Sequence, residues 1–320
     1  MKNRKTNGCF SERYKNVTQN FKSSGQVKEK ENMDINFYKE QLAAKEDMLK
    51  RTTAFLNQAN HSLVAKNQLL AAVQRNTNES ISFAKLIQAS LLPDIAVLKT
   101  YFKDADYLVS QKIGIGGDTI YIRSTNDGVI FCLLDATGHG IPGALLSISG
   151  SLILNEITSS LEVNNASELL QLLNYRLHKT YNNSNSIAHF EGIAFYYSSK
   201  EKKLTYSSAN GKAILFNANG EITPLERTKI SVGEKKDSEF ETFELPVKKR
   251  DKLLLFSDGL IDQFGGKNDK KYGIRKLKQL ISNNLDKNVS KLKQIIIQEH
   301  DNWKADKEQT DDISFKLIEF

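Results

Sequence analysis

Four aspartates in this chain stand beside glycine or beside another aspartate, a setting in which carboxylates often do chemistry. They are Asp118 in Gly116-Gly117-Asp118, Asp135 in Asp135-Ala136-Thr137-Gly138-His139-Gly140, Asp258 in Ser257-Asp258-Gly259, and Asp311 in the pair Asp311-Asp312. Glycine lets the backbone approach a metal ion or a phosphate closely. Four carboxylates brought together would repel one another unless cations neutralised them. The pattern therefore indicates a site for divalent metal ions.

The overall composition narrows the class of protein. The chain has 320 residues, enough for one large domain or two small ones with appendages. Its cysteines, Cys9 and Cys132, provide neither a disulfide framework nor the spacing of metal ligands, so we predict a reducing, cytoplasmic setting. Apolar runs such as 129–134 are far shorter than the roughly 20 residues of a membrane span. The first 30 residues are polar and basic, unlike a signal peptide.

The net charge of +7 is concentrated at the N-terminus. Residues 1–33 contain eight Lys or Arg and three Glu, which leaves the rest of the chain at only +2. A basic segment with few apolar residues is expected to be disordered, or alternatively to contact acidic lipid or a partner protein. The remainder shows no helix-turn-helix or stacking-aromatic signature, so we predict no binding of nucleic acid.

Residues 34–92 predict one long helix that forms a coiled coil. This segment contains neither glycine nor proline, and leucines recur at every seventh position, namely 42, 49, 56, 63 and 70. A sustained heptad repeat is typical of coiled coils, so we predict a parallel homodimer; the alternative is a helix packed back on its own domain. Pro93 is expected to end the helix, because the residue before a proline avoids the helical region.

Beyond Pro93 the sequence alternates between short strands and helices. Strands are expected near 105–113, 118–124, 128–135, 190–197, 203–208, 212–217, 240–245, 252–257 and 312–318. Tight-turn sequences join several of these runs, which favours antiparallel pairing. Helices are expected at 141–160, 166–181, 272–284 and 289–304. Runs of strands with helices between them predict an α+β fold.

The order of the motifs resembles that of a known family. After Ile87-Gln88 and Leu91-Leu92-Pro93 come Gly-Gly-Asp at 116–118, Asp-Ala-Thr-Gly-His-Gly-Ile-Pro-Gly-Ala at 135–144, Ser-Asp-Gly-Leu-Ile-Asp-Gln-Phe-Gly-Gly at 257–266 and Asp-Asp-Ile at 311–313. This series resembles the metal-dependent PPM protein phosphatases, in particular their bacterial SpoIIE-like branch. Each motif alone is weak, but their shared order over 85–320 makes the resemblance strong.

The resemblance implies a fold and a domain organisation. It implies two packed, mainly antiparallel sheets flanked by helices, preceded here by the long coiled-coil helix. The expected parts are a basic disordered tail at 1–33, a coiled-coil or linker helix at 34–92, and a SpoIIE-like phosphatase domain at 93–320.

The resemblance also implies a metal centre that holds two Mn²⁺ or Mg²⁺ ions. Asp135 would bridge both ions, Asp118 and the backbone carbonyl of Ala136 would complete the protein ligands of one, and Asp258 with Asp311 would hold the other. Such oxygen ligands suit hard cations, and water fills the remaining positions.

The activity implied by the resemblance is hydrolysis of phosphoserine or phosphothreonine by a water that bridges the two ions. His139 would serve as a general acid or orient a ligand; alternatively it only fixes the tight turn through its own hydrogen bonds. The implied substrate is a phosphorylated STAS-domain protein of the anti-anti-sigma type, within a partner-switching pathway.

Two other functions could account for part of the sequence. A coiled-coil scaffold of the same fold without catalytic activity would be favoured by loss of a metal aspartate, but all four are present. A nucleotide cyclase site would explain Gly-Gly-Asp, yet it leaves the loop at 135–140 unexplained. The chain departs from the family pattern at Ile122, where many relatives carry a second acid, and at 191–193 and 209–212.

Overall fold

The fold is that of a computed structural model, which describes residues 8–161, 163–181 and 188–320, with side chains from residue 32 onward. The chain separates into two units, Met1–Asn76 and Thr77–Phe320. Each unit is described by itself below.

A single helix, α1, spans Gly8–Ser90. It begins well before residue 34 and therefore runs through most of the segment 1–33 for which the sequence predicts disorder; residues 1–7 lie outside the described residues. Gly25 does not interrupt it, because one glycine costs only about 1 kcal/mol in a helix interior, whereas a new helix needs a costly nucleus. The heptad leucines at 42, 49, 56, 63 and 70 are 58–67% exposed.

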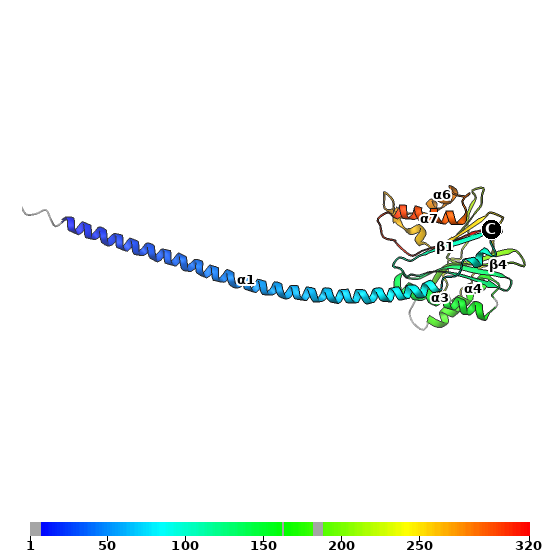
Figure 1. The fold of residues 1–320 in the computed structure, drawn as a ribbon, viewed down its shortest axis with the longest axis horizontal. Coiled ribbons are helices and arrows are strands. Elements are labelled where there is room, and N and C mark those ends of the chain that lie inside the picture. Colours follow the sequence, from blue (N-terminus) through cyan, green and yellow to red (C-terminus); the bar gives the residue numbers. More distant parts are fainter. Residues whose placement is uncertain (1–7, 162, 182–187) are drawn as a thin grey trace, which may run out of the picture. The chain divides into compact units, whose positions relative to one another are not determined.

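Two five-stranded sheets form the centre of Thr77–Phe320 (Figure 1). Sheet A has the order β1-β12-β9-β6-β7, with strands Asp104–Ser110, Ile313–Glu319, Lys252–Phe256, Lys212–Phe216 and Ile222–Pro224. Sheet B has the order β2-β3-β4-β5-β8, with strands Asp118–Thr125, Gly128–Ala136, Phe190–Ser198, Lys203–Ala209 and Phe243–Glu244. All neighbouring strands that pair within the described part of the chain are antiparallel.

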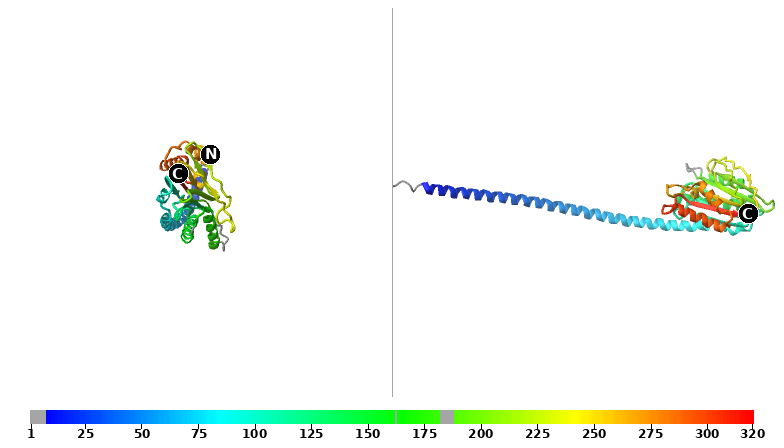
Figure 2. Two further views of the ribbon diagram at one scale, coloured as in Figure 1. Left: turned by 90° about the vertical axis from the view of Figure 1, so that its right-hand side faces the viewer. Right: turned by 90° about the horizontal axis from the view of Figure 1, so that it is seen from above.

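Helices cover the outer face of each sheet. Helices α3 (Gly140–Ser160) and α4 (Ala166–Tyr181) share a core with sheet B, whereas α6 (Gly273–Ser282) and α7 (Val289–Lys304) share one with sheet A. The two helix pairs lie on opposite sides of the sheets in Figure 1, and the left view of Figure 2 shows the same arrangement. This arrangement confirms the predicted α+β sandwich of two antiparallel sheets flanked by helices, with a long helix before it.

A third core fills the space between the two sheets. It includes Phe131 and Phe195 of sheet B, whose rings stack with centroids 5.1 Å apart, and Leu255 and Ile318 of sheet A. Because side chains alternate along a strand, every second residue of each central strand points into this space. The residues that continue this alternation past the ends of the strands therefore lie at the end of the core between the sheets.

Several short elements complete the domain. They are α2 (Ala96–Lys99), α5 (Gly259–Asp262) and the hairpin β10–β11 (Phe264–Gly265 and Lys270–Lys271). Among the described residues, α3 is also the one helix whose length and composition would suit a membrane span. Its buried side, which includes Leu154 and Ile157, packs in the core with sheet B, so α3 is a core helix of the folded domain.

Candidate metal centre

Three acidic residues lie side by side where neighbouring strands of sheet B reach one edge. Asp118 is the first residue of β2 and pairs with Asp135 near the end of β3, which in turn pairs with Glu191 near the start of β4. Asp118 lies two residues before Ile120 on β2, and Asp135 lies two residues after Leu133 on β3. Ile120 and Leu133 both point into the core between the sheets, so the aspartates lie on the same face of sheet B. The alternation of side chains thus directs these carboxylates toward sheet A.

Sheet A supplies two further aspartates at the same end of the core. Asp258 follows β9 and immediately precedes α5, and Asp311 precedes β12. Strands β9 and β12 are antiparallel neighbours, so the end of one lies beside the start of the other. This topology brings together residues that are far apart in the sequence.

A cavity of about 200 Å³ collects most of the predicted site. Its lining residues are Asp135, Ala136, Thr137, Gly138, His139, His189, Glu191, Asp258 and Asp311. Three of the four predicted aspartates, Ala136 and His139 therefore face one space. Asp118 does not line this cavity.

Asp118 is instead buried beside the cavity, with only 1% of its surface exposed. Its Oδ2 accepts a hydrogen bond of 2.7 Å from Ser257 Oγ, while its Oδ1 is buried and has no hydrogen-bond partner. The pKa of Asp118 is raised to about 7, mainly by burial and further by the charges of Asp312 and Asp258, while the side-chain hydroxyls of Ser257 and Ser314 oppose the rise. A buried carboxylate oxygen without a donor calls for a cation.

Asp135 is the most strongly perturbed carboxyl of the site. Burial, together with the charges of Asp118, Asp258, Asp311 and Glu191, raises its pKa to about 10. At neutral pH the cluster can therefore hold its full negative charge only if positive charge is added. Divalent ions would supply that charge.

Asp258 has a positive charge close by that partly offsets the effect of its burial. Burial raises its pKa, and the nearby ammonium of Lys212 opposes this effect more than any other charge does. Lys212 is the first residue of β6, the strand next to β9. It belongs to the segment 209–212, where the chain departs from the family pattern.

Two glycines shape the backbone around the cavity. Gly138 and Gly140 have φ angles of 91° and 69°, in the left-handed region that favours glycine. Between them, His139 lies at the N-cap of α3, is exposed, and makes no capping hydrogen bond with its side chain. The position of His139 on the cavity wall is thus open to a ligand.

The ligand atoms at the site suit a hard cation, although in this structure they are not arranged closely enough to coordinate one. Across the described side chains, no three His, Cys, Asp or Glu residues are grouped so that they could hold a metal ion. The carboxylates of Asp135, Asp258 and Asp311, which line the cavity together with two histidines, offer oxygen atoms of the kind that Mg²⁺ and Mn²⁺ prefer. A Cβ on Gly117 would lie 2.6 Å from the carbonyl oxygen of Ala136, so the glycine keeps that oxygen uncrowded.

Other residues of the site were not expected from the sequence. His189 and Glu191 line the cavity, and Glu191 Oε1 accepts a hydrogen bond of 2.7 Å from Asn210 Nδ2. The carboxylate of Asp312 accepts hydrogen bonds from the backbone N–H groups of Gly117 and Lys112, at 2.7 and 2.8 Å. Asp312 therefore fastens the loop that leads to Asp118.

The acidic residue nearest Asp258 in the sequence has a different setting. Asp262 forms an ion pair of 2.7 Å with Lys271 and does not line the cavity. The ion pair therefore gives Asp262 a structural role outside the candidate site.

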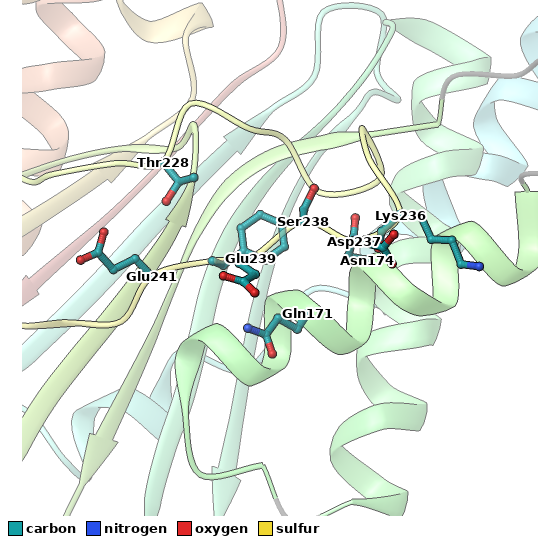
Figure 3. Close-up of a pocket in the computed structure, with 9 residues that line it drawn as sticks. Gln171, Asn174, Thr228, Lys236, Asp237, Ser238, Glu239 and Glu241 are labelled. Atoms are coloured by element: carbon teal, nitrogen blue, oxygen red, sulfur yellow. The ribbon is translucent and has the colours of Figure 1, made fainter.

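A larger cavity of about 760 Å³ lies between α4 and the segment 236–241 (Figure 3). Gln171 and Asn174 project from α4 toward this segment. The buried amide of Asn174 is already occupied, because it accepts from Gly233 N and donates to the carbonyls of Lys235 and Lys236. Asn174 thus ties a loop to the helix, and the cavity collects none of the four aspartates.

The chain resembles known proteins in sequence. The sequence profile of Stage II sporulation protein E (SpoIIE) matches residues 125–320, which include Asp135, Asp258 and Asp311 but not Asp118. The phosphoserine phosphatase RsbP of Bacillus subtilis (strain 168) is 24% identical over 248 residues, which cover 76% of this chain. The same alignment covers only 58% of RsbP, so this chain spans little more than half of that relative.

Solved structures share the fold. The SiaA-PP2C domain of Pseudomonas aeruginosa superposes with a TM-score of 0.71 at 20% identity, over 78% of this chain and 99% of that one. The PP2C phosphatase domain of SpoIIE from Bacillus subtilis, with a fragment of its regulatory domain, gives 0.56 at 12% identity, over 68% and 63%. The family profile covers well over half of the chain, which confirms the resemblance drawn from the motifs, and the chain belongs to the SpoIIE family.

Proposed function

We propose that this protein is a metal-dependent protein phosphatase that hydrolyses phosphoserine or phosphothreonine. The observation that carries the proposal is the convergence of Asp135, Asp258 and Asp311 on one cavity, beside the unpartnered buried oxygen of Asp118. The name of the relative RsbP, a phosphoserine phosphatase, supports the same chemistry.

The proposed ligands follow the geometry of the site. Asp135 would contact both of two Mn²⁺ or Mg²⁺ ions, because it is paired with Asp118 in sheet B and shares its cavity with Asp258 and Asp311. Asp118 and the carbonyl of Ala136 would serve one ion, and Asp258 with Asp311 the other. When bound, the ions would acidify a water for attack on phosphorus and offset the charge of the phosphoryl group.

His139 is proposed as the group that delivers a proton to the departing serine or threonine oxygen. It is exposed on the cavity wall, and its side chain makes no capping hydrogen bond. Imidazole is the side chain that most often serves as a general acid.

Hydrolysis of p-nitrophenyl phosphate tests the proposal. We expect activity that depends on added Mn²⁺, and we expect Asp135→Asn and Asp258→Asn each to lower it by at least about 100-fold, since even residues behind the ligands commonly cost 10- to 100-fold. Asp262→Asn is the matched control, because this carboxylate comes from the same motif but pairs with Lys271. Activity that survives both site substitutions would refute the metal assignment.

The same measurement separates the enzyme from the alternative, an inactive coiled-coil scaffold of the same fold. A purified wild-type chain with no Mn²⁺-dependent hydrolysis of any phosphoprotein or small phosphate ester would favour the scaffold. The physiological substrate we propose is a phosphorylated STAS-domain protein in a partner-switching pathway, within the reducing cytoplasmic setting predicted from the cysteines.

We further propose that α1 forms a parallel homodimer through its heptad leucines, each of which is more than half exposed. In sedimentation, the full chain of 36.1 kDa is expected at twice this mass, and a chain that begins at Thr77 is expected as a monomer. Beginning at Thr77 keeps Gln88, whose amide donates to Gly116 O at 2.7 Å within the unit Thr77–Phe320.

A second pair of full-length variants controls for the loss of the helix. Leu56→Glu with Leu63→Glu places charge in the leucine stripe and should give monomers. Gln58→Glu with Gln68→Glu adds the same charge on other positions of the helix and should leave the dimer intact. Monomeric wild-type chain would exclude the dimer.

A further inference from the structure

Ser257 joins the two sheets at the candidate metal centre. It follows directly after β9 of sheet A, is only 3% exposed, and donates from Oγ to Asp118 Oδ2 on β2 of sheet B at 2.7 Å. The two residues are 139 positions apart in the sequence. Among the motif residues, Ser257 had no role of its own in the site predicted from the sequence.

The hydroxyl of Ser257 is oriented by its surroundings. It has one proton to donate, and Asp118 Oδ2 at 2.7 Å is much closer than the carbonyl oxygens of Ser314 and Asp312, at 3.4 and 3.5 Å. A lone pair of the same Oγ accepts the backbone N–H of Ser314 at 2.9 Å. The proton is therefore directed to Asp118, and the charged acceptor makes this the stronger bond.

This bond decides which oxygen of Asp118 remains available. Oδ2 is engaged by Ser257, while Oδ1 is fully buried and has no partner among the described residues. The bond from Gln111 Nε2 goes to the backbone carbonyl of Asp118 and does not orient the carboxylate. The hydroxyl of Ser314 also acts on this carboxylate, and it opposes the rise of its pKa less than Ser257 does. Ser257 is thus the stronger of the two hydroxyls that act on this carboxylate, and its bond to Oδ2 leaves Oδ1 available.

We infer that Ser257 is a positioning residue for the metal centre: its hydroxyl holds Asp118 Oδ2, so that Oδ1 is presented to a bound divalent ion. The inference rests on the proposed metal-dependent function. It assigns a task to the serine of the Ser257-Asp258-Gly259 motif, because one motif then supplies a proposed ligand, Asp258, and orients a second one on the opposite sheet. Hydrogen bonds of this kind behind a ligand tune both its direction and its basicity.

Calorimetric titration of the full-length, EDTA-treated chain with Mn²⁺ tests the inference. Ser257→Ala is expected to weaken Mn²⁺ binding by about 10- to 100-fold, the usual cost of losing a hydrogen bond behind a metal ligand. Ser257→Thr keeps the hydroxyl and should bind within a few-fold of wild type. Ser207→Ala is the matched control, because it removes another fully buried hydroxyl, from the opposite face of sheet B, and should leave affinity unchanged.

Two readouts separate positioning from a purely structural role. The Mn²⁺ concentration for half-maximal activity should rise in Ser257→Ala, while kcat at saturating Mn²⁺ stays within a few-fold of wild type. In an Asp118→Asn background, Ser257→Ala should cause no further loss of Mn²⁺ affinity, because its effect passes through that carboxylate.

Each contrary outcome has a defined meaning. Unchanged Mn²⁺ affinity in Ser257→Ala, or losses that add in the double variant, would overturn the role of Ser257 and leave the proposed function intact. A threonine variant that binds as poorly as the alanine variant would assign the loss to packing and also overturn it. Wild-type chain that binds no Mn²⁺ would overturn the proposed function itself.

Discussion

Asp135→Asn is expected to stabilise the metal-free chain at neutral pH by roughly 3 kcal/mol, although it removes activity. Burial and four neighbouring carboxylates raise the pKa of Asp135 to about 10, whereas an unfolded aspartate titrates near 3.8. The folded state therefore binds the extra proton between these values. The contribution of Asp135 to stability is fully present below about pH 4 and is lost as the pH rises toward 10, by at most about 1.4 kcal/mol per pH unit. Asparagine carries no charge and removes this loss.

Urea unfolding in EDTA at pH 5 and pH 8 measures the effect. Wild-type chain should lose stability between the two values, and Asp135→Asn should lose markedly less. Mn²⁺ should then stabilise wild type at pH 8 but not the variant, since a ligand at 100 times its dissociation constant adds about 2.7 kcal/mol. Asp306→Asn removes an exposed carboxylate and serves as the control. Equal pH dependence in wild type and Asp135→Asn would contradict the electrostatic account.

The contrast between stability and activity follows from the position of Asp135. Like charges directly opposite one another on neighbouring strands are unfavourable, and Asp135 faces Asp118 on one side and Glu191 on the other. A sequence selected only for stability would not place three acids in one row across a sheet. Bound cations would offset the repulsion among these three carboxylates, which accounts for such a row at a metal site.

The sequence predicts the main strands well because their side chains alternate or form continuous apolar runs between clear turns. The prediction of 128–135 for β3 and 190–197 for β4 differs from the structure by one residue at one end. Strands β7, β10 and β11 were not predicted, since two or three residues carry no measurable periodicity. Helix α1 starts earlier than expected, because composition alone does not indicate where a propagating helix stops.

The residues of the candidate site differ in whether the sequence could predict them. Its aspartates could be selected in advance because each stands in a recognisable local motif. The contributions of Glu191 and Ser257 could not, since each depends on a partner fixed only by tertiary structure: Glu191 faces Asp135 through the register of β3 and β4, and Ser257 reaches Asp118 across the two sheets. Local sequence carries no record of which residues lie opposite after folding.

The second large effect is expected at Lys316, a buried lysine of β12 in the inter-sheet core. Its side chain is 0% exposed, its Nζ donates to the carbonyls of Cys132 and Tyr121 at 3.3 and 3.4 Å, and it lies 5.1 Å from the ring centre of Phe131. Among the described residues, the structure shows no ion pair to this ammonium. Burial lowers its pKa to about 7 from the usual 10.5. The folded chain therefore bears the cost of a buried charge below pH 7.

The sign of the pH dependence is opposite to that of Asp135. Between pH 7 and 10.5 the unfolded state binds one more proton than the folded state at this residue, so the contribution of Lys316 to stability should rise with pH by up to about 1.4 kcal/mol per unit. Lys316→Met keeps a long apolar stem without the charge. It should be more stable than wild type at pH 7 by roughly 2 kcal/mol, as when other buried charges are replaced by apolar side chains.

Chemical unfolding of wild type, Lys316→Met and Lys200→Met at pH 6.5 and pH 9.5 distinguishes this effect from the titration of other groups. Lys200 is exposed in the turn after β4, so its replacement should leave the pH dependence of wild type unchanged. The advantage of Lys316→Met over wild type should shrink from pH 6.5 to pH 9.5, because the wild-type lysine becomes neutral in the folded state. A constant difference at both pH values would mean that Lys316 stays charged in the core, held by the strand carbonyls and the ring of Phe131.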